Sequence, residues 1–275
     1  PVKALLIFNG GTLEATADAP SFVEKLSSTG ETLVVVKSGG AKINSGIYAI
    51  GIDVALTEDA VSTGGGLTKL GDGTLTLSGA NTYTGATLVE AGTLALGAAG
   101  SIADSASIIV AADATLDVTA QAAFALADGQ TLGGNGDVIG DVTAVDGSTI
   151  APGLSIGTLT VTGDLAVGGT LAIEYNSNTP AIDLLNVSGA LDLSSATLSF
   201  SDLGESTLTG EPYVFATYGT LAGAPAFEPI GTPTGYVVDY AYEGNKVALV
   251  LIPEPSALAL LAGLLALLAG CRARR

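Results

Sequence analysis

The stretch LTKLGDGTLTLSGANTYTGATLVEAGTLALG, residues 67–97, decides the fold because it contains one alternating pattern twice. GTLTL at 73–77 and GTLAL at 92–96 both place an aliphatic residue at every second position. In a β-strand such residues face one side, while the residues between them face the other. Glycine and other small residues bound each copy, as turns require. Each copy therefore predicts a short strand with one buried, apolar face and one solvent-exposed face.

The same pattern recurs along most of the chain. Further copies are ATLDV at 114–118, GTLTV at 157–161, GTLAI at 169–173, GALDL at 189–193 and ATLSF at 196–200. Thr recurs at positions 74, 93 and 115, and Ala190 is the equivalent of Thr170 in the next copy. The spacings between successive positions, 74 to 93, 93 to 115 and 170 to 190, are all close to the lower end of the range of about 20 to 50 residues that indicates a solenoid or a propeller. Because no helical pattern intervenes, we predict an all-β fold, a parallel β-helix whose aliphatic residues stack inside. A β-sandwich of meandering strands would show the same alternation and is the alternative.

The composition favours a slender body over a compact globule. The 275 residues are 48% hydrophobic but only 5% aromatic, without Trp or Met, so the core must be built from Leu, Val, Ile and Ala. With 38 Gly and 13% charged residues the chain departs from an average globular protein. Its apolar fraction nevertheless predicts that it folds.

The charged residues narrow the class of function. The net charge is −18, and no Lys or Arg lies between Lys69 and Lys246. We therefore expect no nucleic-acid partner, because binding nucleic acid requires clustered cations. The chain has no His, the usual general base, and its single Cys271 leaves the body without a disulfide. We expect no catalytic residue, metal or cofactor, and hence a protein that is not an enzyme. A glycan-active β-helix with two facing carboxylates among the 27 acidic residues is the enzymatic alternative.

A set of positions within 67–97 resembles a known repeat. These positions are Gly71, Gly73, Thr74, Leu75, Leu77, Gly79, Asn81, Tyr83, Gly85 and Gly92 to Leu94. On them the stretch resembles one full copy of the autotransporter-associated β-strand repeat, also called the passenger-associated transport repeat. The segments at 132–142 and 148–165 are similar to the coils that often follow it. The resemblance implies a right-handed β-helix at the cell surface, frequently in passenger domains. An autotransporter-type passenger is therefore a second alternative for the function.

Residues 204–252 form a second predicted unit, after the β-helix body at 1–203. A Pro- and Gly-rich connecting loop leads to two alternating runs, YVVDYAY and KVALVLI, which are joined by EGN. This order predicts a β-hairpin over 236–252 with Gly244 and Asn245 at its turn. Such a hairpin would cap the last coil and cover its exposed edge.

The third predicted unit, residues 253–275, ends with an apolar run and a basic tip. Pro253, Glu254 and Pro255 should stay extended, because proline fixes φ and lacks a backbone N–H. The sixteen uncharged residues that follow are short for a permanent span, which needs about 20, and suit a transient membrane helix. Positions along this helix are Ser256, Leu260, Leu264, Leu268 and Gly270. By the positive-inside rule the basic tail would stay cytoplasmic: Arg272, Arg274 and Arg275.

The order of tripeptide, apolar helix and terminal basic cluster resembles the PEP-CTERM sorting signal. The resemblance implies an exosortase, a membrane transpeptidase that cleaves near the tripeptide and passes the protein to the outer surface. It also associates the protein with an exopolysaccharide matrix. The opening PVKALLIF has no charged leader and no cleavage site, so we expect a processed or truncated start. We therefore expect a secreted cell-surface or extracellular-matrix protein with a structural or adhesive role, anchored transiently in the inner membrane by its C-terminal helix. An ordinary tail anchor is the alternative for this segment.

Other conspicuous residues are expected to be structural. GGNGDVIGD at 133–141 resembles in part the Gly–Asp nonapeptide that binds Ca²⁺ between coils, but its Asp register is off by one and it has no second copy. Turn chemistry is expected there instead, with three solvated loop residues: Asp137, Asp141 and Asp146. Lys69 should point outward from the repeat. Asn81 and Tyr83 should be stacked turn residues, with contact to a ligand as the alternative.

Overall fold

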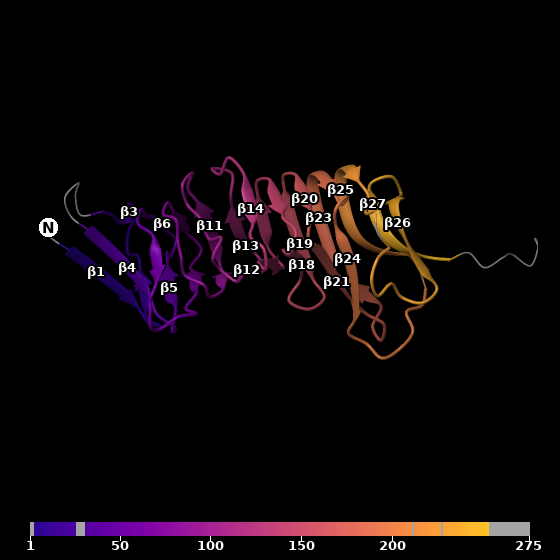
Figure 1. Ribbon diagram of the computed structural model, residues 1–275, viewed down its shortest axis with the longest axis horizontal. Helices are drawn as coiled ribbons and strands as arrows, with labels where there is room; N and C mark the ends of the chain where they lie inside the picture. The colour runs from indigo at the N-terminus through magenta and orange to yellow at the C-terminus, as the bar shows by residue number, and fades with distance from the viewer. Residues whose placement is uncertain (1–2, 26–30, 211, 227, 253–275) are drawn as a thin grey trace, which may run out of the picture.

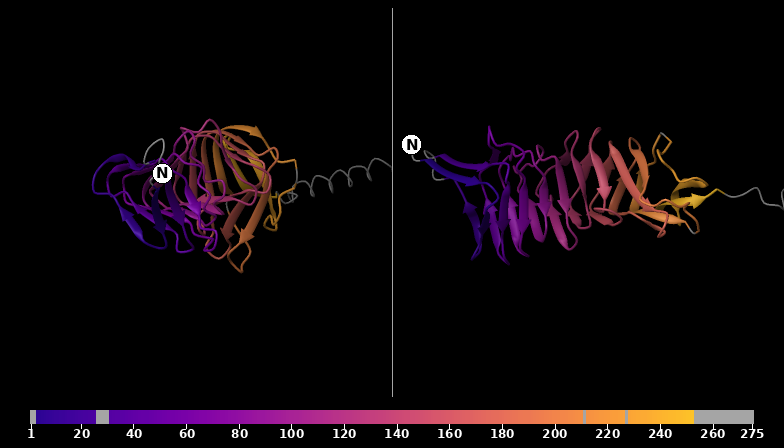
Figure 2. Two further views of the ribbon diagram at one scale, coloured as in Figure 1. Left: turned by 60° about the vertical axis from the view of Figure 1, so that its left-hand side comes forward. Right: turned by 90° about the horizontal axis from the view of Figure 1, so that it is seen from below.

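The computed structural model describes residues 3–25, 31–210, 212–226 and 228–252, and over these residues the chain forms 27 β-strands and no helix. The strands wind into an elongated rod with the N-terminal strands at one end and β26 and β27 at the other (Figure 1). Two further views show the strands crossing the long axis of the rod in successive layers (Figure 2). The predicted all-β class is confirmed.

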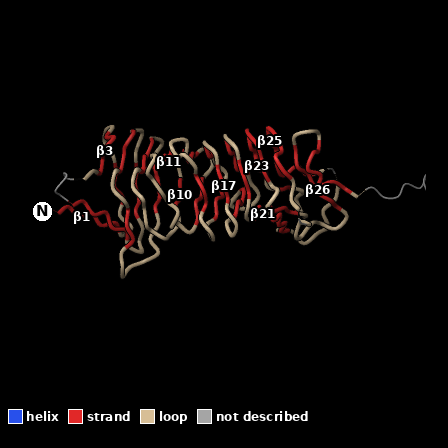
Figure 3. The backbone as a smooth tube through the Cα atoms, turned by 45° about the horizontal axis from the view of Figure 1, so that its top comes forward, coloured by secondary structure: helices blue, strands red, loops and turns tan. Residues whose placement is uncertain are grey.

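Three sheets run along the rod, and loops join their short strands at the corners (Figure 3). The first sheet, in the N-terminal part, contains β1 (Lys3–Phe8), β4 (Glu31–Val36) and β7 (Leu56–Glu58). The second contains ten strands: β2 (Thr12–Glu14), β5 (Ala41–Asn44), β8 (Leu67–Leu70), β10 (Thr87–Val89), β12 (Ser107–Val110), β15 (Thr131–Gly134), β18 (Thr149–Pro152), β21 (Thr170–Asn176), β22 (Ala181–Ile182) and β24 (Thr197–Asp202). The third contains fourteen: β3 (Ala19–Val23), β6 (Ala49–Ile52), β9 (Thr74–Leu77), β11 (Gly92–Leu96), β13 (Ala114–Asp117), β14 (Phe124–Leu126), β16 (Asp137–Ile139), β17 (Val142–Ala144), β19 (Thr158–Thr162), β20 (Leu165–Val167), β23 (Leu184–Asp192), β25 (Tyr213–Gly223), β26 (Tyr236–Tyr242) and β27 (Lys246–Leu251).

Each coil contributes a strand to the second sheet and then at least one to the third, as β8 and β9 do before β10 and β11. Strands of neighbouring coils pair in parallel: Leu67 of β8 pairs with Thr87 of β10, and Leu75 of β9 with Leu94 of β11. In the second sheet nine strands follow one another in this way from β2 to β24, which gives eight coil steps over the described residues. Parallel pairing between consecutive coils confirms the solenoid. It rules out a sandwich of meandering strands, whose neighbours run antiparallel.

A further row of strands closes the later coils. β14, β17 and β20 pair in parallel, and the row ends on β23. The nine residues of β23 serve two faces, because Leu185 pairs with Leu159 of β19 while Leu191 pairs with Leu165 of β20. A single strand thus turns a corner of the solenoid.

The predicted coil lengths are confirmed in the repeat and wrong further along. Positions 74, 93 and 115 pair with one another along the third sheet, so the spacing between these Thr residues is the length of a coil. Thr170 pairs with Thr197, later in the chain than predicted, because β21 first folds back on β22 in a local antiparallel hairpin. Ala190 lies on β23 in the third sheet, and it is therefore not the equivalent of Thr170.

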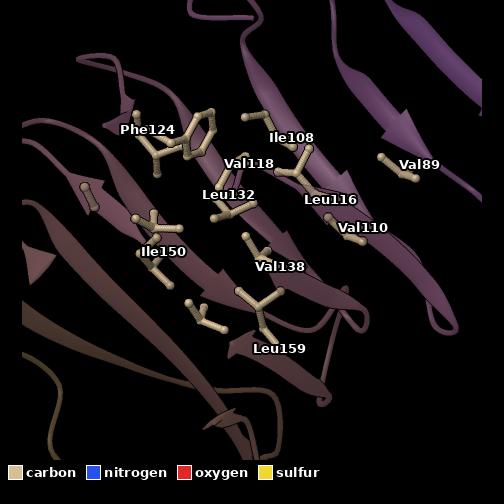
Figure 4. Packing of buried hydrophobic residues seen from close by; sticks show 14 of the residues in the cluster. Val89, Ile108, Val110, Leu116, Val118, Phe124, Leu132, Val138, Ile150 and Leu159 are labelled. Carbon is tan, nitrogen blue, oxygen red and sulfur yellow. The ribbon is translucent and has the colours of Figure 1, made fainter. Parts of the chain in front are cut away.

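The core consists of aliphatic side chains that stack from coil to coil. One inward column of the third sheet is joined by register pairs along its length: Ile50, Leu75, Leu94, Leu116, Val138, Val161 and Val187. Each of these side chains is at most 3% exposed. Figure 4 shows side chains of both sheets gathered inside the middle coils, among them Leu116 and Val138 of the third sheet and Ile108 and Leu132 of the second. Burying one such side chain is worth about 1.5–3 kcal/mol, so the columns hold the coils together.

The hairpin predicted over 236–252 is present as β26 and β27. Its antiparallel register begins with Tyr236 paired to Leu251. The turn is the predicted segment 243–245, which contains Gly244 and Asn245, and Glu243 and Gly244 have positive φ, at 50° and 91°. β27 also pairs antiparallel with β25, so the parallel stack passes into an antiparallel edge. The apolar helix expected after this hairpin falls outside the described residues.

Replacing Leu94 tests the inward column. Leu94 is fully buried and pairs with Leu75 and Leu116, so we expect Leu94→Ala to lower the free energy of unfolding by about 2–5 kcal/mol. Thr93→Ala removes an outward side chain and should change this free energy by roughly 0.5 kcal/mol or less. Urea unfolding measures both variants. Equal losses would contradict the inward position of Leu94.

Candidate functional site

The residues predicted to act in sorting lie outside the described part of the chain. The description ends at Ile252, directly before Pro253, Glu254 and Pro255. The remaining predicted positions follow these: Ser256, Leu260, Leu264, Leu268, Gly270, Arg272, Arg274 and Arg275. Within the described ranges, the structure contains no helix with the length and apolar character that a membrane crossing requires. The roles assigned to this segment stay predictions.

The repeat at 67–97 forms two successive coils, β8 with β9 and β10 with β11. Its glycines lie where backbones of neighbouring coils meet. Gly92 has a φ of +62°, and a Cβ at this position would lie 2.5 Å from the carbonyl oxygen of Gly71. An L-residue at position 92 would be strained in conformation and in space. The glycines that carry the resemblance therefore have a packing role.

Asn81 joins three backbone segments. Its Oδ1 accepts a hydrogen bond from the amide of Leu56 at 2.9 Å, and its Nδ2 donates to the carbonyl oxygens of Gly79 at 3.0 Å and Ser101 at 2.8 Å. The residue is only 3% exposed. Because an unpaired buried polar group costs about 1–3 kcal/mol, this amide stabilises the loop between β9 and β10 against its neighbouring coils. The predicted turn role of Asn81 is confirmed.

Tyr83 lies in the interior of the solenoid. It is 1% exposed, and its hydroxyl is 2.7 Å from Oγ1 of Thr87. The Thr87 hydroxyl donates to Oγ of Ser105 at 2.9 Å, and Ser105 donates to the carbonyl oxygen of Gly85 at 2.8 Å. Burial holds the pKa of Tyr83 above its usual range. Tyr83 is a core residue whose hydroxyl belongs to a chain of hydrogen bonds that ends on a backbone carbonyl. Its side chain is therefore not accessible to a ligand.

Lys69 is inside the solenoid, and the prediction that it points outward is wrong. The residue is 0% exposed and pairs in register with Ile43 of β5 and Val89 of β10, which are both buried. Lys69 follows Leu67 by two positions on one strand, so both side chains share the inward face. The expectation followed the charge of the residue instead of the alternation of the strand.

Three carbonyl oxygens receive the ammonium group of Lys69. Its Nζ donates to the carbonyl oxygens of Gly71 at 2.7 Å, Ala91 at 3.0 Å and Leu70 at 3.1 Å. Loss of hydration lowers the pKa of Lys69 to about 8, while the nearby carboxylate of Asp72 acts in the opposite direction. Gly71 and Ala91 precede strands of successive coils, so the ammonium links those coils. Its three N–H groups are matched by three acceptors of the chain itself.

Asp183 is a buried carboxylate that sequence reasoning missed. It is 0% exposed, its Oδ1 accepts from the amide of Gly157 at 2.9 Å, and its Oδ2 accepts from the amide of Glu174 at 2.7 Å. Loss of hydration raises the pKa of Asp183 to about 6, against the effect of these two hydrogen bonds. The available signal was its position between Ile182 and Leu184 in an apolar run. Asp183 ties the loop before β19 to strand β21.

The three residues expected in solvent are exposed, namely Asp137, Asp141 and Asp146, but Asp137 is the first residue of strand β16 and not a loop residue as predicted. Asp141 accepts a hydrogen bond at 2.9 Å from the amide of Asp164, a residue of the next coil, so it links neighbouring coils instead of closing a local turn. Over the described residues, no group of three or more His, Cys, Asp or Glu side chains gathers where it could hold a metal ion.

Two clefts lie beside the C-terminal hairpin. The first has a volume of about 480 Å³, and its described lining includes Glu228 and Tyr240. The second has a volume of about 600 Å³ and is lined in part by Asp239, Tyr242 and Leu251. Each cleft has one carboxylate among its described lining residues, whereas hydrolysis of a glycosidic bond uses a pair.

Comparisons with known proteins identify the repeat. Residues 67–96 match the family model described as Passenger-associated-transport-repeat. The chain is also 53% identical over 53 residues to a protein named Adhesin BmaC autotransporter from Brucella suis biovar 1 (strain 1330). This alignment covers 19% of the chain and 2% of that protein. The resemblance of residues 67–97 to the passenger-associated repeat is confirmed.

Buried Lys69 predicts a dependence of stability on alkaline pH. Its pKa is about 8 in the folded chain and 10.5 for the free side chain, so between these values the unfolded chain keeps a proton that the folded chain has released. The contribution of Lys69 to stability therefore rises as the pH increases from about 8 to about 10.5. We expect the free energy of unfolding of the wild type, relative to that of Lys69→Met, to increase across this interval in urea unfolding.

Lys42→Met is the matched control, because Lys42 is an exposed lysine on the adjacent strand β5. A difference between wild type and Lys69→Met that stays constant or falls with pH would contradict the burial of Lys69.

Proposed function

We propose that the chain is a secreted cell-surface or extracellular-matrix protein with a structural or adhesive role, delivered by a C-terminal sorting signal. The observation that carries this proposal is that the matched repeat forms two coils of a continuous parallel solenoid. The adhesive role is supported by the name of the similar protein, which is called an adhesin.

The outer face of the second sheet suits a rod with a structural role and no catalytic site. A column of hydroxyl side chains runs along it, joined by register pairs: Ser107, Thr131, Thr149, Thr170 and Thr197. Small residues stand beside this column, among them Gly133 and Ala151, which pair with each other. Hydroxyl groups repeated about every 4.8 Å offer many weak hydrogen bonds to a matrix. They do not form a reaction centre.

We also propose that the protein is not an enzyme. The ammonium of Lys69 is fully engaged by backbone carbonyls, so it is not available to neutralise an acidic sugar. The two clefts described above each provide one carboxylate from different residues, Glu228 and Asp239. A glycan-active β-helix is the alternative, which two carboxyl groups about 5 to 10 Å apart on one face would favour.

The C-terminal segment supplies the proposed route to the surface. Its tripeptide, uncharged run and terminal arginines support an exosortase-type membrane transpeptidase as partner. In this proposal the run is inserted transiently in the inner membrane until cleavage near Pro253, Glu254 and Pro255 releases the body. A hydrated exopolysaccharide matrix is the proposed destination, and a net charge of −18 would oppose collapse and self-association there.

An autotransporter-type passenger is the second candidate function. The matched repeat and the similar autotransporter favour it. The alignment covers 2% of that protein, so only the architecture of the repeat supports this candidate.

Intact-mass analysis of the protein from its own cells tests the sorting route. We expect the surface form to lack everything after the tripeptide, because a transpeptidase would leave the apolar run in the membrane. Pro253→Ala combined with Pro255→Ala should keep the chain uncleaved. Pro225→Ala combined with Pro229→Ala changes prolines outside the signal and should be processed like the wild type. A surface form that still contains Arg275 would contradict the route.

A further inference from the structure

An apolar patch lies on the C-terminal hairpin. Val237 is 44% exposed and Ile252 is 52% exposed, and Val250 is half-buried. Pairing makes these residues neighbours, because Val237 pairs with Val250 and the amide of Ile252 donates to the carbonyl oxygen of Gly235 at 2.8 Å. We call Val237, Val250 and Ile252, which alternation places on one face of the hairpin, the hairpin patch. Exposed apolar residues that adjoin one another in this way mark a site of contact with a protein or a membrane.

The cleft of about 600 Å³ extends the hairpin patch. Val250 and Leu251 line it together with Pro212 and the phenol of Tyr242, and Asp239 is the charged residue of its described wall. Tyrosine has an apolar ring and a polar end, a combination that is enriched where protein meets the surface of a bilayer. The chemistry of this region therefore suits the boundary between water and lipid.

The chain that follows the patch limits what can cover it. Ile252 is the last described residue, and the uncharged run begins four residues later at Ser256. Four residues span at most about 14 Å when extended. If the run enters a bilayer, the chain length keeps Ile252, at the edge of the hairpin patch, within about 14 Å of the point of entry.

We infer that the hairpin patch rests on the lipid surface while the C-terminal run is inserted, and that this contact holds Pro253, Glu254 and Pro255 at the membrane interface. The inference rests on the proposed sorting route. The partner is the headgroup and upper acyl-chain region of a bilayer. A zwitterionic surface fits best, because Asp239 and the net charge of −18 are repelled by anionic lipid. The contact positions the tripeptide for a protease that is itself embedded in the membrane.

Single tryptophans test this contact, because the natural chain contains no Trp and an introduced one reports only its own surroundings. Full-length variants Val237→Trp and Ile252→Trp probe the hairpin patch, and Leu264→Trp probes the run. Val61→Trp is the matched control, because Val61 is an apolar residue that is 93% exposed in the N-terminal half. Each variant is reconstituted in phosphatidylcholine vesicles with and without brominated acyl chains. Circular dichroism confirms that each keeps its β structure.

We expect brominated lipid to reduce emission at positions 237, 252 and 264 and to leave position 61 unchanged. The two patch variants are independent, so one that misfolds leaves the other as the test. Loss of emission at position 264 alone would overturn the lipid contact and leave the insertion of the run intact. Unchanged emission at position 264 would contradict both the lipid contact and the insertion of the run. Blue-shifted but unquenched emission at position 237, together with a dimer in sedimentation, would identify a second copy as the occupant and overturn the lipid contact.

Discussion

Parallel hydrogen bonding between coils places each inward residue directly over the inward residue of the coil before it. Side chains alternate along a strand, so a slip of one residue would exchange an aliphatic column for a column of hydroxyl groups. The column from Ile50 to Val187 avoids this by keeping an aliphatic residue at every step. Only the strands need to be in register, so the loops can vary in length. The short coil from Thr74 to Thr93 and the longer coil from Thr170 to Thr197 therefore belong to the same solenoid. A chain with few aromatic residues can therefore build a long, continuous core.

The same constraint decides where the polar residues of the repeat can act. Asn81 and Lys69 are both buried, and each directs its polar side-chain atoms to backbone groups of its own and of neighbouring coils. In the part of the chain that the structure describes, every buried side-chain nitrogen and oxygen has a hydrogen-bond partner. The most distinctive residues of the repeat are thus committed to structure. This leaves the outer faces and the C-terminal end as the places where the protein can meet a partner.

The strands could be predicted because alternation is a local property, and the positions of Thr74 and Thr93 gave the coil length directly. Lys69 was misplaced because charge was weighed above alternation, although three carbonyl oxygens can hold a buried ammonium. The match of Thr170 with Ala190 failed because the β21–β22 hairpin lengthens that coil, and a local pattern does not reveal where a coil closes. The burial of Asp183 depends on Gly157 in another loop, so it follows from tertiary contacts that alternation does not encode. The C-terminal signal, in contrast, is predicted from a contiguous motif, which needs no tertiary information.

Disulfide cross-linking tests the coil register most directly. In a Cys271→Ser background, which removes the only natural cysteine, Thr74 and Thr93 are changed together to cysteine. Register partners on adjacent strands are about 4.8 Å apart, within the range of roughly 4.4–6.8 Å that a disulfide bridges. Thr74 and Ala95 face the same side but lie about 8 Å apart, which is beyond that range. Mild oxidation should therefore link the 74–93 pair and spare the 74–95 pair. Linkage of the 74–95 pair without the 74–93 pair would contradict the solenoid register.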